Sequence, residues 1–224
     1  MDLSLNQKTY DTIKKDIMTF ALKPGEGVSA AKLAERYQVS RTPVREALVK
    51  LQAEGMVDIY PKSKSVISKI NINLAQQEWF LRKTLELGMV DAFFERVTAS
   101  DIVKMESYYQ KQLTFSDIAK THEAAYQYLL SDNDFHAVTY HVAGEEISAS
   151  IIKGTMTHYA RLRLLVDLDG QNKDRTFNDH KQLIAYVKAA DKEGYRRCLE
   201  HHLCYIKQDI ERVRDIYPDI FVTE

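Results

Sequence analysis

The chain of 224 residues has few cysteines and no long apolar runs. Its two cysteines, Cys198 and Cys204, are six positions apart and are expected to lie on one helix. Side chains at this spacing diverge, so we expect no disulfide but the reduced thiols that are the default in the cytosol. No stretch approaches the ~20 apolar residues that cross a bilayer, and the N-terminus has no apolar signal segment. The sequence therefore predicts a cytoplasmic protein that does not enter a membrane.

Proline and glycine are also scarce, with four and eight residues. No proline occurs between Leu74 and Tyr217, and this stretch has no convincing strand pattern. The spacing of its apolar residues predicts helices near 74–97, 100–113, 117–143, 145–167, 174–190 and 192–216. An all-helical body of about 145 residues is large enough to bury a core of its own.

The formal net charge is only −1, so the overall charge excludes little. The charges are unevenly distributed, however. Residues 1–70 contain 12 basic and 8 acidic side chains, whereas the remaining residues contain 19 and 24. A basic N-terminal part on an acidic body is typical of a nucleic-acid-binding domain joined to a second domain, although chance scatter gives the same pattern.

The most informative run, residues 39–48, predicts a turn followed by an amphipathic helix. Val44 and Leu48 are one helical turn apart and would face a core. Ser40 can cap the start of the helix. Pro43 falls in the first turn, where a missing N–H has no cost. This run therefore predicts a helix that packs by one face and leaves another face exposed.

Two arginines lie on the exposed face of this helix. Arg41 and Arg45 are one turn apart near its N-terminal end. Guanidinium groups placed there suit phosphate oxygens and the O6/N7 edge of guanine. The recognition helix of a helix-turn-helix reads bases with its N-terminal residues in this way. We therefore expect Arg41, Thr42 and Arg45 to contact DNA, and Ser40 to contact phosphate.

The neighbouring residues complete the pattern of a winged helix-turn-helix. The expected elements are helices at 6–20 and 30–37, the recognition helix up to Glu54, and strands at 56–60 and 66–70. Gly55 is a natural stop for the recognition helix. Lys62 and Lys64 lie at the tip between the two strands, where they would meet phosphates or a minor groove. The alternative is a solvated basic loop.

Four polar residues of the helical body form a candidate metal site. Asp132 and His136 are one helical turn apart, which places a carboxylate and an imidazole on one face. His202 falls on the apolar stripe of the last helix, whereas His201 falls beside it. His180 precedes apolar residues on the inner side of its own helix. Burying a carboxylate and three imidazoles together without a shared partner would cost folding free energy, because their polar atoms would lose water. A divalent cation is the simplest partner that they could share.

Nitrogen and oxygen ligands without thiolate suit Zn, Ni, Mn or Fe, and the ligand set alone does not distinguish between these metals. Among these metals we favour zinc. Two alternatives stay open at this point. An Asp-x-x-x-His pair is often a surface or capping pair, and a single inward histidine is often a hydrogen-bonded core residue.

The sequence resembles two known families over nearly its whole length. Residues 8–70 are similar to the winged helix-turn-helix of the GntR family of bacterial transcription regulators, through residues 39–48 followed by Leu51 and Glu54-Gly55. Residues 74–217 resemble the FCD ligand-binding domain of the FadR subgroup. The matching pieces are Arg82-x-x-Leu85-Glu86, Asp132-x-x-Phe135-His136, Ala143-Gly144, His180-x-x-Leu183-Ile184 and His202-Leu203.

The resemblance implies a mainly α protein with two domains. A winged helix-turn-helix DNA-binding domain is expected at 1–70, a linker at 71–73, and an all-helical effector-binding and dimerisation domain at 74–224. The resemblance also implies a homodimer that binds a palindromic operator in double-stranded DNA and is usually released by a small carboxylate.

The resemblance carries over a metal site and an effector contact as well. The implied metal ligands are Asp132, His136, His180 and His202. Arg82 matches an arginine that often faces the effector, and its alternative role is a salt bridge to a neighbouring acid. His158 shares a stripe with apolar residues and would either line the effector pocket or be a core histidine.

The chain departs from the family pattern at three places. Glu145 follows Ala143-Gly144 where the family usually has asparagine, so that helix start is expected to differ. The wing tip lacks the common glycine, which puts minor-groove contacts in doubt. Ala31 replaces a residue that is often charged or polar, which removes one possible DNA contact.

These observations predict a metabolite-responsive transcription regulator rather than an enzyme. We expect a repressor, although activation is equally compatible with the residues. One alternative is a metal-dependent hydrolase with a DNA-binding appendage, but no separate general base stands at a convincing position. Another is a regulator whose metal only stiffens the bundle.

Overall fold

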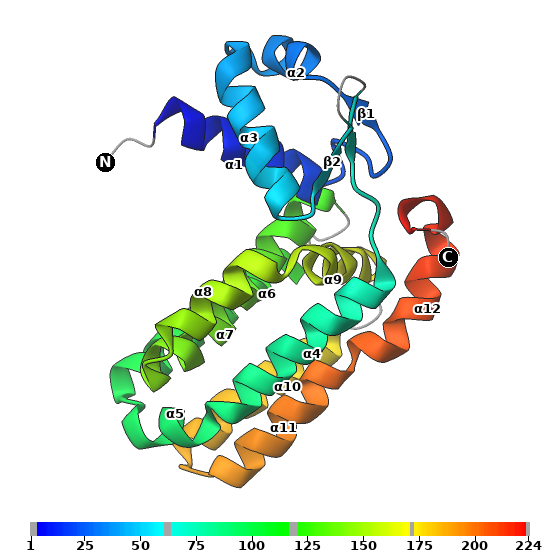
Figure 1. The fold of residues 1–224 in the computed structure, drawn as a ribbon. Coiled ribbons are helices and arrows are strands. Elements are labelled where there is room, and N and C mark those ends of the chain that lie inside the picture. Colours follow the sequence, from blue (N-terminus) through cyan, green and yellow to red (C-terminus); the bar gives the residue numbers. More distant parts are fainter. Residues whose placement is uncertain (1–3, 61–63, 117–120, 171–172, 223–224) are drawn as a thin grey trace. The chain divides into compact units, whose positions relative to one another are not determined.

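The computed structural model describes residues 4–60, 64–116, 121–170 and 173–222, which divide into two compact units (Figure 1). Of the described residues, those up to 72 and those from 217 to 222 form the first unit, and those between 73 and 216 form the second. The chain therefore crosses between the units twice. Its last residues, which we expected in the helical domain, pack with the first unit instead.

The first unit is a winged helix-turn-helix. It contains α1 (Leu5–Met18), β1 (Gly27–Val28), α2 (Ala30–Tyr37), α3 (Arg41–Ala53), β2 (Val57–Ile59) and β3 (Ser65–Ile67). Strand β3 lies between β1 and β2 and is antiparallel to both, with Val57 opposite Ile67. The expected helices and hairpin are confirmed. Strand β1 escaped prediction because two residues are too few to show an alternating pattern.

Helix α3 packs against α1 through the apolar stripe that the sequence indicated. Val44 and Leu51 of α3 and Ile13 and Ile17 of α1 are fully buried. Ser40 occupies the N-cap position of α3, but its hydroxyl makes no capping hydrogen bond, so that part of the prediction is wrong. The chain leaves α3 through residues 54 and 55, the second of which is a glycine with a φ of +72°. Such a left-handed conformation favours glycine and ends the helix there.

The C-terminal segment is attached to the first unit by backbone pairing. After the short 3-10 helix η1 (Pro218–Ile220), Phe221 pairs with Ile70 in a parallel bridge. The N–H of Ile70 donates to the carbonyl of Ile220, and the N–H of Val222 donates to the carbonyl of Ile70, both at 3.0 Å. Phe221 is only 2% exposed, so the segment that pairs with Ile70 also brings a buried aromatic ring.

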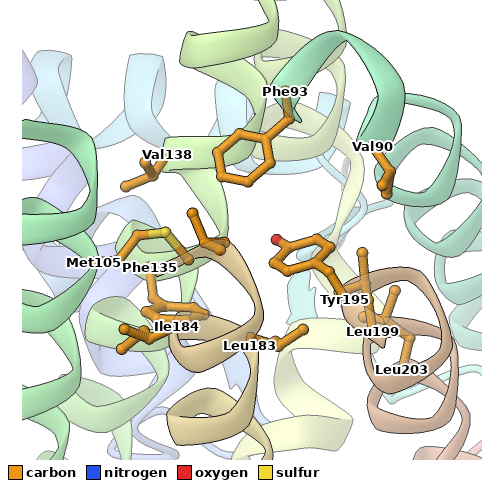
Figure 2. Packing of buried hydrophobic residues seen from close by; sticks show 11 residues of the cluster. Val90, Phe93, Met105, Phe135, Val138, Leu183, Ile184, Tyr195, Leu199 and Leu203 are labelled. Atoms are coloured by element: carbon orange, nitrogen blue, oxygen red, sulfur yellow. The ribbon is translucent and has the colours of Figure 1, made fainter. Parts of the chain in front are cut away.

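The second unit is helical throughout its described residues. Its helices are α4 (Ile72–Gly88), α5 (Val90–Arg96), α6 (Ala99–Ser116), α7 (His122–Ala143), α8 (Glu146–Thr155), α9 (Thr157–Asp169), α10 (Lys173–Lys188), α11 (Lys192–Cys204) and α12 (Ile206–Ile216). Buried apolar residues of α5, α6, α7, α10 and α11 meet in one cluster (Figure 2), in which the rings of Phe93 and Tyr195 lie 5.5 Å apart. Among the described helices, none combines the length and the apolar character needed to span a bilayer.

Three of the expected helices are each divided into two. The breaks fall at Met89, Met156 and Tyr205, which separate α4 from α5, α8 from α9 and α11 from α12. The first break follows Gly88, a residue of low helix propensity. At the second, the carboxylate of Glu78 accepts a hydrogen bond of 2.6 Å from the backbone N–H of Tyr159. A side chain from α4 thus supplies an acceptor that a new helix start requires.

Candidate functional site

Three imidazoles and one carboxylate converge in the middle of the second unit. Asp132 and His136 come from α7, His180 from α10 and His202 from α11. One ligand atom of each lies within 4.8 Å of those of the others. The first three residues are at most 3% exposed, and the side chain of His202 is 9% exposed. The structure therefore brings together all four residues that the sequence proposed for a metal, and leaves His201 exposed.

Each of the three imidazoles is held by a hydrogen-bond acceptor on its outer side. Nδ1 of His136 lies 2.8 Å from a carboxylate oxygen of Glu86, and Nδ1 of His180 lies 2.7 Å from the amide oxygen of Gln112. Nδ1 of His202 is 3.4 Å from a carboxylate oxygen of Asp179. Because these partners are acceptors, each Nδ1 carries the proton and donates it. The lone pair of each ring is then on Nε2, which faces the centre.

The inward nitrogens lack partners that would satisfy three lone pairs. Nε2 of His180 and Nε2 of His202 are only 3.3 Å apart, and two lone pairs facing each other repel. Nε2 of His136 is buried and meets no hydrogen-bond partner within the described part of the chain. A cation at the centre would turn all three lone pairs into bonds. Histidines fixed from outside by carboxylate or amide oxygens are the usual surroundings of a bound metal, so the residues fit one.

The electrostatics of the cluster favour the neutral forms of His180 and His202, whose pKa values are lowered by burial, and the ionised form of Asp132. Burial lowers the pKa of His180 well below its usual range, and the neighbouring His202 lowers it further. Burial alone would raise the pKa of Asp132, but the positive charges of Arg163 and Arg82 hold it well below its usual range. Neutral imidazole and carboxylate are the forms that bind a divalent ion.

Two arginines face the carboxylate of Asp132. Arg163 of α9 is hydrogen-bonded to it directly, and Nη2 of Arg82 lies 3.7 Å from the same oxygen. Arg82 also donates through Nε to Glu86 at 2.6 Å. The alternative role of Arg82, a salt bridge to a neighbouring acid, is therefore present in the structure.

A pocket opens next to this cluster. Asp132 and His202 line it together with three arginines, Arg82, Arg163 and Arg175. The guanidinium of Arg175 lies 3.4 Å from the centre of the Tyr205 ring, and its Nη2 lies 3.3 Å from Asp209. The remaining lining residues include Tyr128, Tyr159, Val166, Asp167, Thr176, Leu203 and Ile206. The pocket thus combines two candidate metal ligands with guanidinium groups from three different helices.

His158 lies elsewhere. It is 7% exposed and is not among the residues that line the pocket. Its Nδ1 is 3.1 Å from Nη2 of the fully buried Arg161. Of its two expected roles, this position matches a core histidine and not a pocket residue.

In the first unit, the exposed face of α3 carries the residues expected to meet DNA. Ser40, Arg41, Thr42 and Arg45 are all exposed. Neither arginine forms an ion pair with any residue in the described ranges. Two unneutralised guanidiniums at the start of a helix are available to phosphate or to base edges. Lys64 is exposed directly before β3, whereas Lys62 lies outside the described residues.

Comparison with known proteins gives the same division of the chain. Residues 5–67 match the family of bacterial regulatory proteins called gntR, and residues 79–204 match the FCD domain. The HTH-type transcriptional repressor RspR of Escherichia coli K12 is 23% identical over 220 residues, covering 98% of this chain and 95% of RspR. The regulator McbR of the same organism is 26% identical over 203 residues, covering 88% of each protein.

The chain belongs to the GntR family.

It is a DNA-binding transcription regulator of the type that carries a C-terminal FCD domain. A solved structure of E. coli McbR/YncC superposes with a TM-score of 0.74 at 23% identity, over 96% of this chain and 100% of that one. At this level of identity, the likeness supports the fold of the GntR-family chain and not its ligand.

Several residues of this site were missed by sequence reasoning. Gln112 and Asp179 come from helices distant in sequence, and nothing in their spacing indicates that they hold imidazoles. Arg163 and Arg175 were missed for the same reason, because the sequence does not show which of its arginines reach a pocket and which reach solvent. Glu86 could have been found, since it is four residues after Arg82 within a motif that the sequence analysis quoted.

Proposed function

We propose that this GntR-family regulator is a metabolite-responsive repressor. It binds a palindromic operator as a homodimer through α3 and the wing, using Ser40, Arg41, Thr42, Arg45, Lys62 and Lys64. Its helical domain senses a small carboxylate next to a divalent metal held by Asp132, His136, His180 and His202. The repressor role is supported by the name of RspR, a relative that matches nearly the whole chain.

One observation carries the metal part of the proposal. Three Nε2 atoms with lone pairs face a common centre, while each Nδ1 is held by an acceptor. A metal held by these four residues would supply Lewis acidity there, to which an oxygen ligand could bind. Nitrogen and oxygen donors without sulfur fit zinc, which we favour, as well as Ni, Mn or Fe.

The pocket supports a carboxylate as the effector. Arg82 and Arg163 already hold the carboxylate of Asp132, so they are placed to hold a second one beside it. Bidentate binding of planar carboxylates is a property of guanidinium groups. To switch the regulator, the effector must bind the DNA-competent and the released states with different affinity. Residues of α9, α10 and α12 line the pocket, and shifts between these helices are the structural change that we propose.

The experiment that tests the metal site compares His136→Ala with His201→Ala. We expect wild type to carry about one metal ion per chain by elemental analysis, and His136→Ala to lose most of it. The exposed His201, next in sequence to a proposed ligand, is the matched control and should retain full metal content. Full retention in His136→Ala would remove this residue from the ligand set.

The same proteins test the sensing role. A DNA fragment selected by wild type is titrated with and without acetate, succinate and citrate. A carboxylate that fits the pocket should weaken DNA binding of the metal-loaded protein and have no effect on His136→Ala. Metal removal that lowers stability but leaves the response to acids unchanged would instead assign the metal a purely structural role.

A further inference from the structure

Helix α8 presents an apolar face that no described part of this chain covers. It contains no fully buried residue. Its inner side packs through Ala149 and Ile152 on the small cluster around Tyr140. On the opposite side, Ile147 is 78% exposed and Ile151 is 41% exposed. Large apolar side chains in such positions mark an interaction surface when they form a continuous stripe.

The exposed residues of α8 do form one stripe, in which large and small side chains alternate. Ile147, Ser150, Ile151 and Gly154 follow the spacing of a single helix face. A Cβ atom added at Gly154 would meet nothing within 4 Å, so the space above this residue is open. On this face the side chains of Ile147 and Ile151 therefore project, whereas Ser150 and Gly154 leave shallow positions between them.

We infer that this face binds the same face of a second copy of the chain, with the two α8 helices antiparallel, at the centre of the homodimer. The inference rests on the dimer in the proposed function and adds its location. A two-fold axis through the middle of the stripe places Ile147 opposite the partner's Gly154. The same register places Ile151 opposite the partner's Ser150. Each large side chain then meets a small one, which is the self-complementarity that a two-fold interface requires.

The charges at the edge of the stripe support this register independently. Glu146 and Lys153 are seven residues apart, so they lie on the same flank of α8. In an antiparallel helix pair, equal flanks meet, and the register given above brings Glu146 within two residues, about 3 Å along the helix axis, of the position opposite the partner's Lys153. The carboxylate of Glu146 lies 3.0 Å from Nδ1 of His141 and is 67% exposed, so it remains accessible to a second partner. Pairing α8 with itself thus matches size and charge in one arrangement.

A stable interface typically buries about 1,600 Å² in total. A pair of ten-residue helices is smaller than this, so adjoining surfaces of the helical unit contribute around it. The α8 pair is the centre of the interface, and changes at its closest approach have the largest effect.

The decisive test compares Gly154→Leu with Gly154→Ala in the full chain. The Cβ atom of a leucine here meets nothing within 4 Å in one chain, and leucine favours a helix more than glycine does, so we expect the fold and its melting temperature to be maintained or raised. In the dimer it collides with the partner's Ile147, so the dimer dissociation constant should rise about 100-fold or more by analytical ultracentrifugation. Alanine fits the shallow position and should keep the dimer. A Gly154→Leu protein that dimerises as wild type does would overturn the inference.

A charge-reversal series tests the register. Glu146→Lys and Lys153→Glu each place like charges near one another and should weaken the dimer about tenfold at low salt. The double variant restores opposite charges across the interface and should dimerise nearly as tightly as wild type. A double variant as weak as the single ones would contradict the antiparallel register.

The outcomes separate this inference from the proposed function. A wild-type chain that is monomeric both in solution and on DNA would overturn the proposed homodimer and, with it, this interface. A dimeric wild type whose Gly154→Leu variant remains dimeric would overturn the α8 interface alone.

Discussion

At the scale of single residues, each buried histidine is defined by the partner of its outer ring nitrogen. His136 and His180 donate from Nδ1 to Glu86 and Gln112, and their Nε2 atoms face the candidate metal centre. His158 has a guanidinium beside its Nδ1 instead. A guanidinium is only a donor, so this nitrogen of His158 must accept, and the ring stays neutral. The same residue type is therefore set up for metal binding in one place and for packing in another.

The environment of His158 predicts a pH-dependent contribution to folding stability. Burial lowers the pKa of His158 to about 4, and Arg161 adds to the shift. A histidine in the unfolded chain titrates near 6.5, so between these values the unfolded state binds a proton that the folded state does not. Stability is therefore lost as the pH falls from about 6.5 towards 4. In His158→Gln, the loss between pH 7 and pH 5 should be smaller by about 1 kcal/mol.

Urea unfolding at the two pH values measures this difference. His201→Gln changes an exposed histidine and serves as the control, which should lose as much stability as wild type. An equal loss of stability in His158→Gln and wild type would show that the neutral form of His158 is not favoured by the fold.

Residue spacing predicted the inner ring of the candidate site better than its surroundings. Asp132 and His136 share a turn of α7, and the apolar stripe of the last helix separates His202 from His201, so local periodicity was sufficient. The residues that hold the imidazoles, such as Gln112 and Asp179, reach them from other helices. Only the packing of α6, α10 and α11 brings them near, and packing is not visible in local patterns.

At the scale of secondary-structure elements, α3 separates its packing role from its binding role. Its buried side holds it to α1, while Arg41 and Arg45 are exposed and form no ion pair with the described residues. Arg45→Ala should therefore leave stability nearly unchanged. It should weaken binding to a DNA fragment selected by wild type by about 1–3 kcal/mol if the arginine reads a base. Fluorescence anisotropy with labelled DNA measures the change.

Lys50 provides the control for this prediction, because it lies in the last turn of the same helix with its ammonium 5.4 Å from the Tyr10 ring. Lys50→Ala should have a much smaller effect on DNA affinity. Unchanged affinity and unchanged sequence preference in Arg45→Ala would exclude it from base recognition.

The periodicity of apolar residues predicted which segments are helical, but it did not predict where these helices are interrupted. The apolar stripes of α8 and α9 follow one another without a proline between them, so the sequence reads as one helix. The interruption at Met156 coincides with the acceptor that Glu78 provides from α4. Such a long-range cap depends on where another helix lies, and therefore appears only in the folded structure.

At the scale of the whole molecule, the C-terminal segment belongs to the DNA-binding unit although it follows the last helix of the other unit. Phe221 is buried there, and its neighbours pair with Ile70. Phe221→Ala should destabilise this unit by about 3 kcal/mol, because a cavity replaces the ring. Hydrogen exchange of the full chain should show faster exchange in residues 4–60, with the helical unit and its metal content unaffected.

Val222 is 48% exposed and follows directly in sequence, so Val222→Ala is the matched control. It keeps the backbone pairing with Ile70 and should exchange as wild type does. If Phe221→Ala leaves exchange of the first unit unchanged, the C-terminal segment is dispensable for that unit.

The pairing of Phe221 with Ile70 has a practical consequence for the design of chimeras in which the DNA-binding unit is fused to a different sensor domain. A fragment that ends at residue 72 would lack the C-terminal segment and the buried Phe221 that belong to the DNA-binding unit. A working chimera would also have to carry the residues beyond 216, joined to the C-terminal end of the foreign sensor. The sensor domain would then be an insertion between the two chain segments that fold together as the DNA-binding unit.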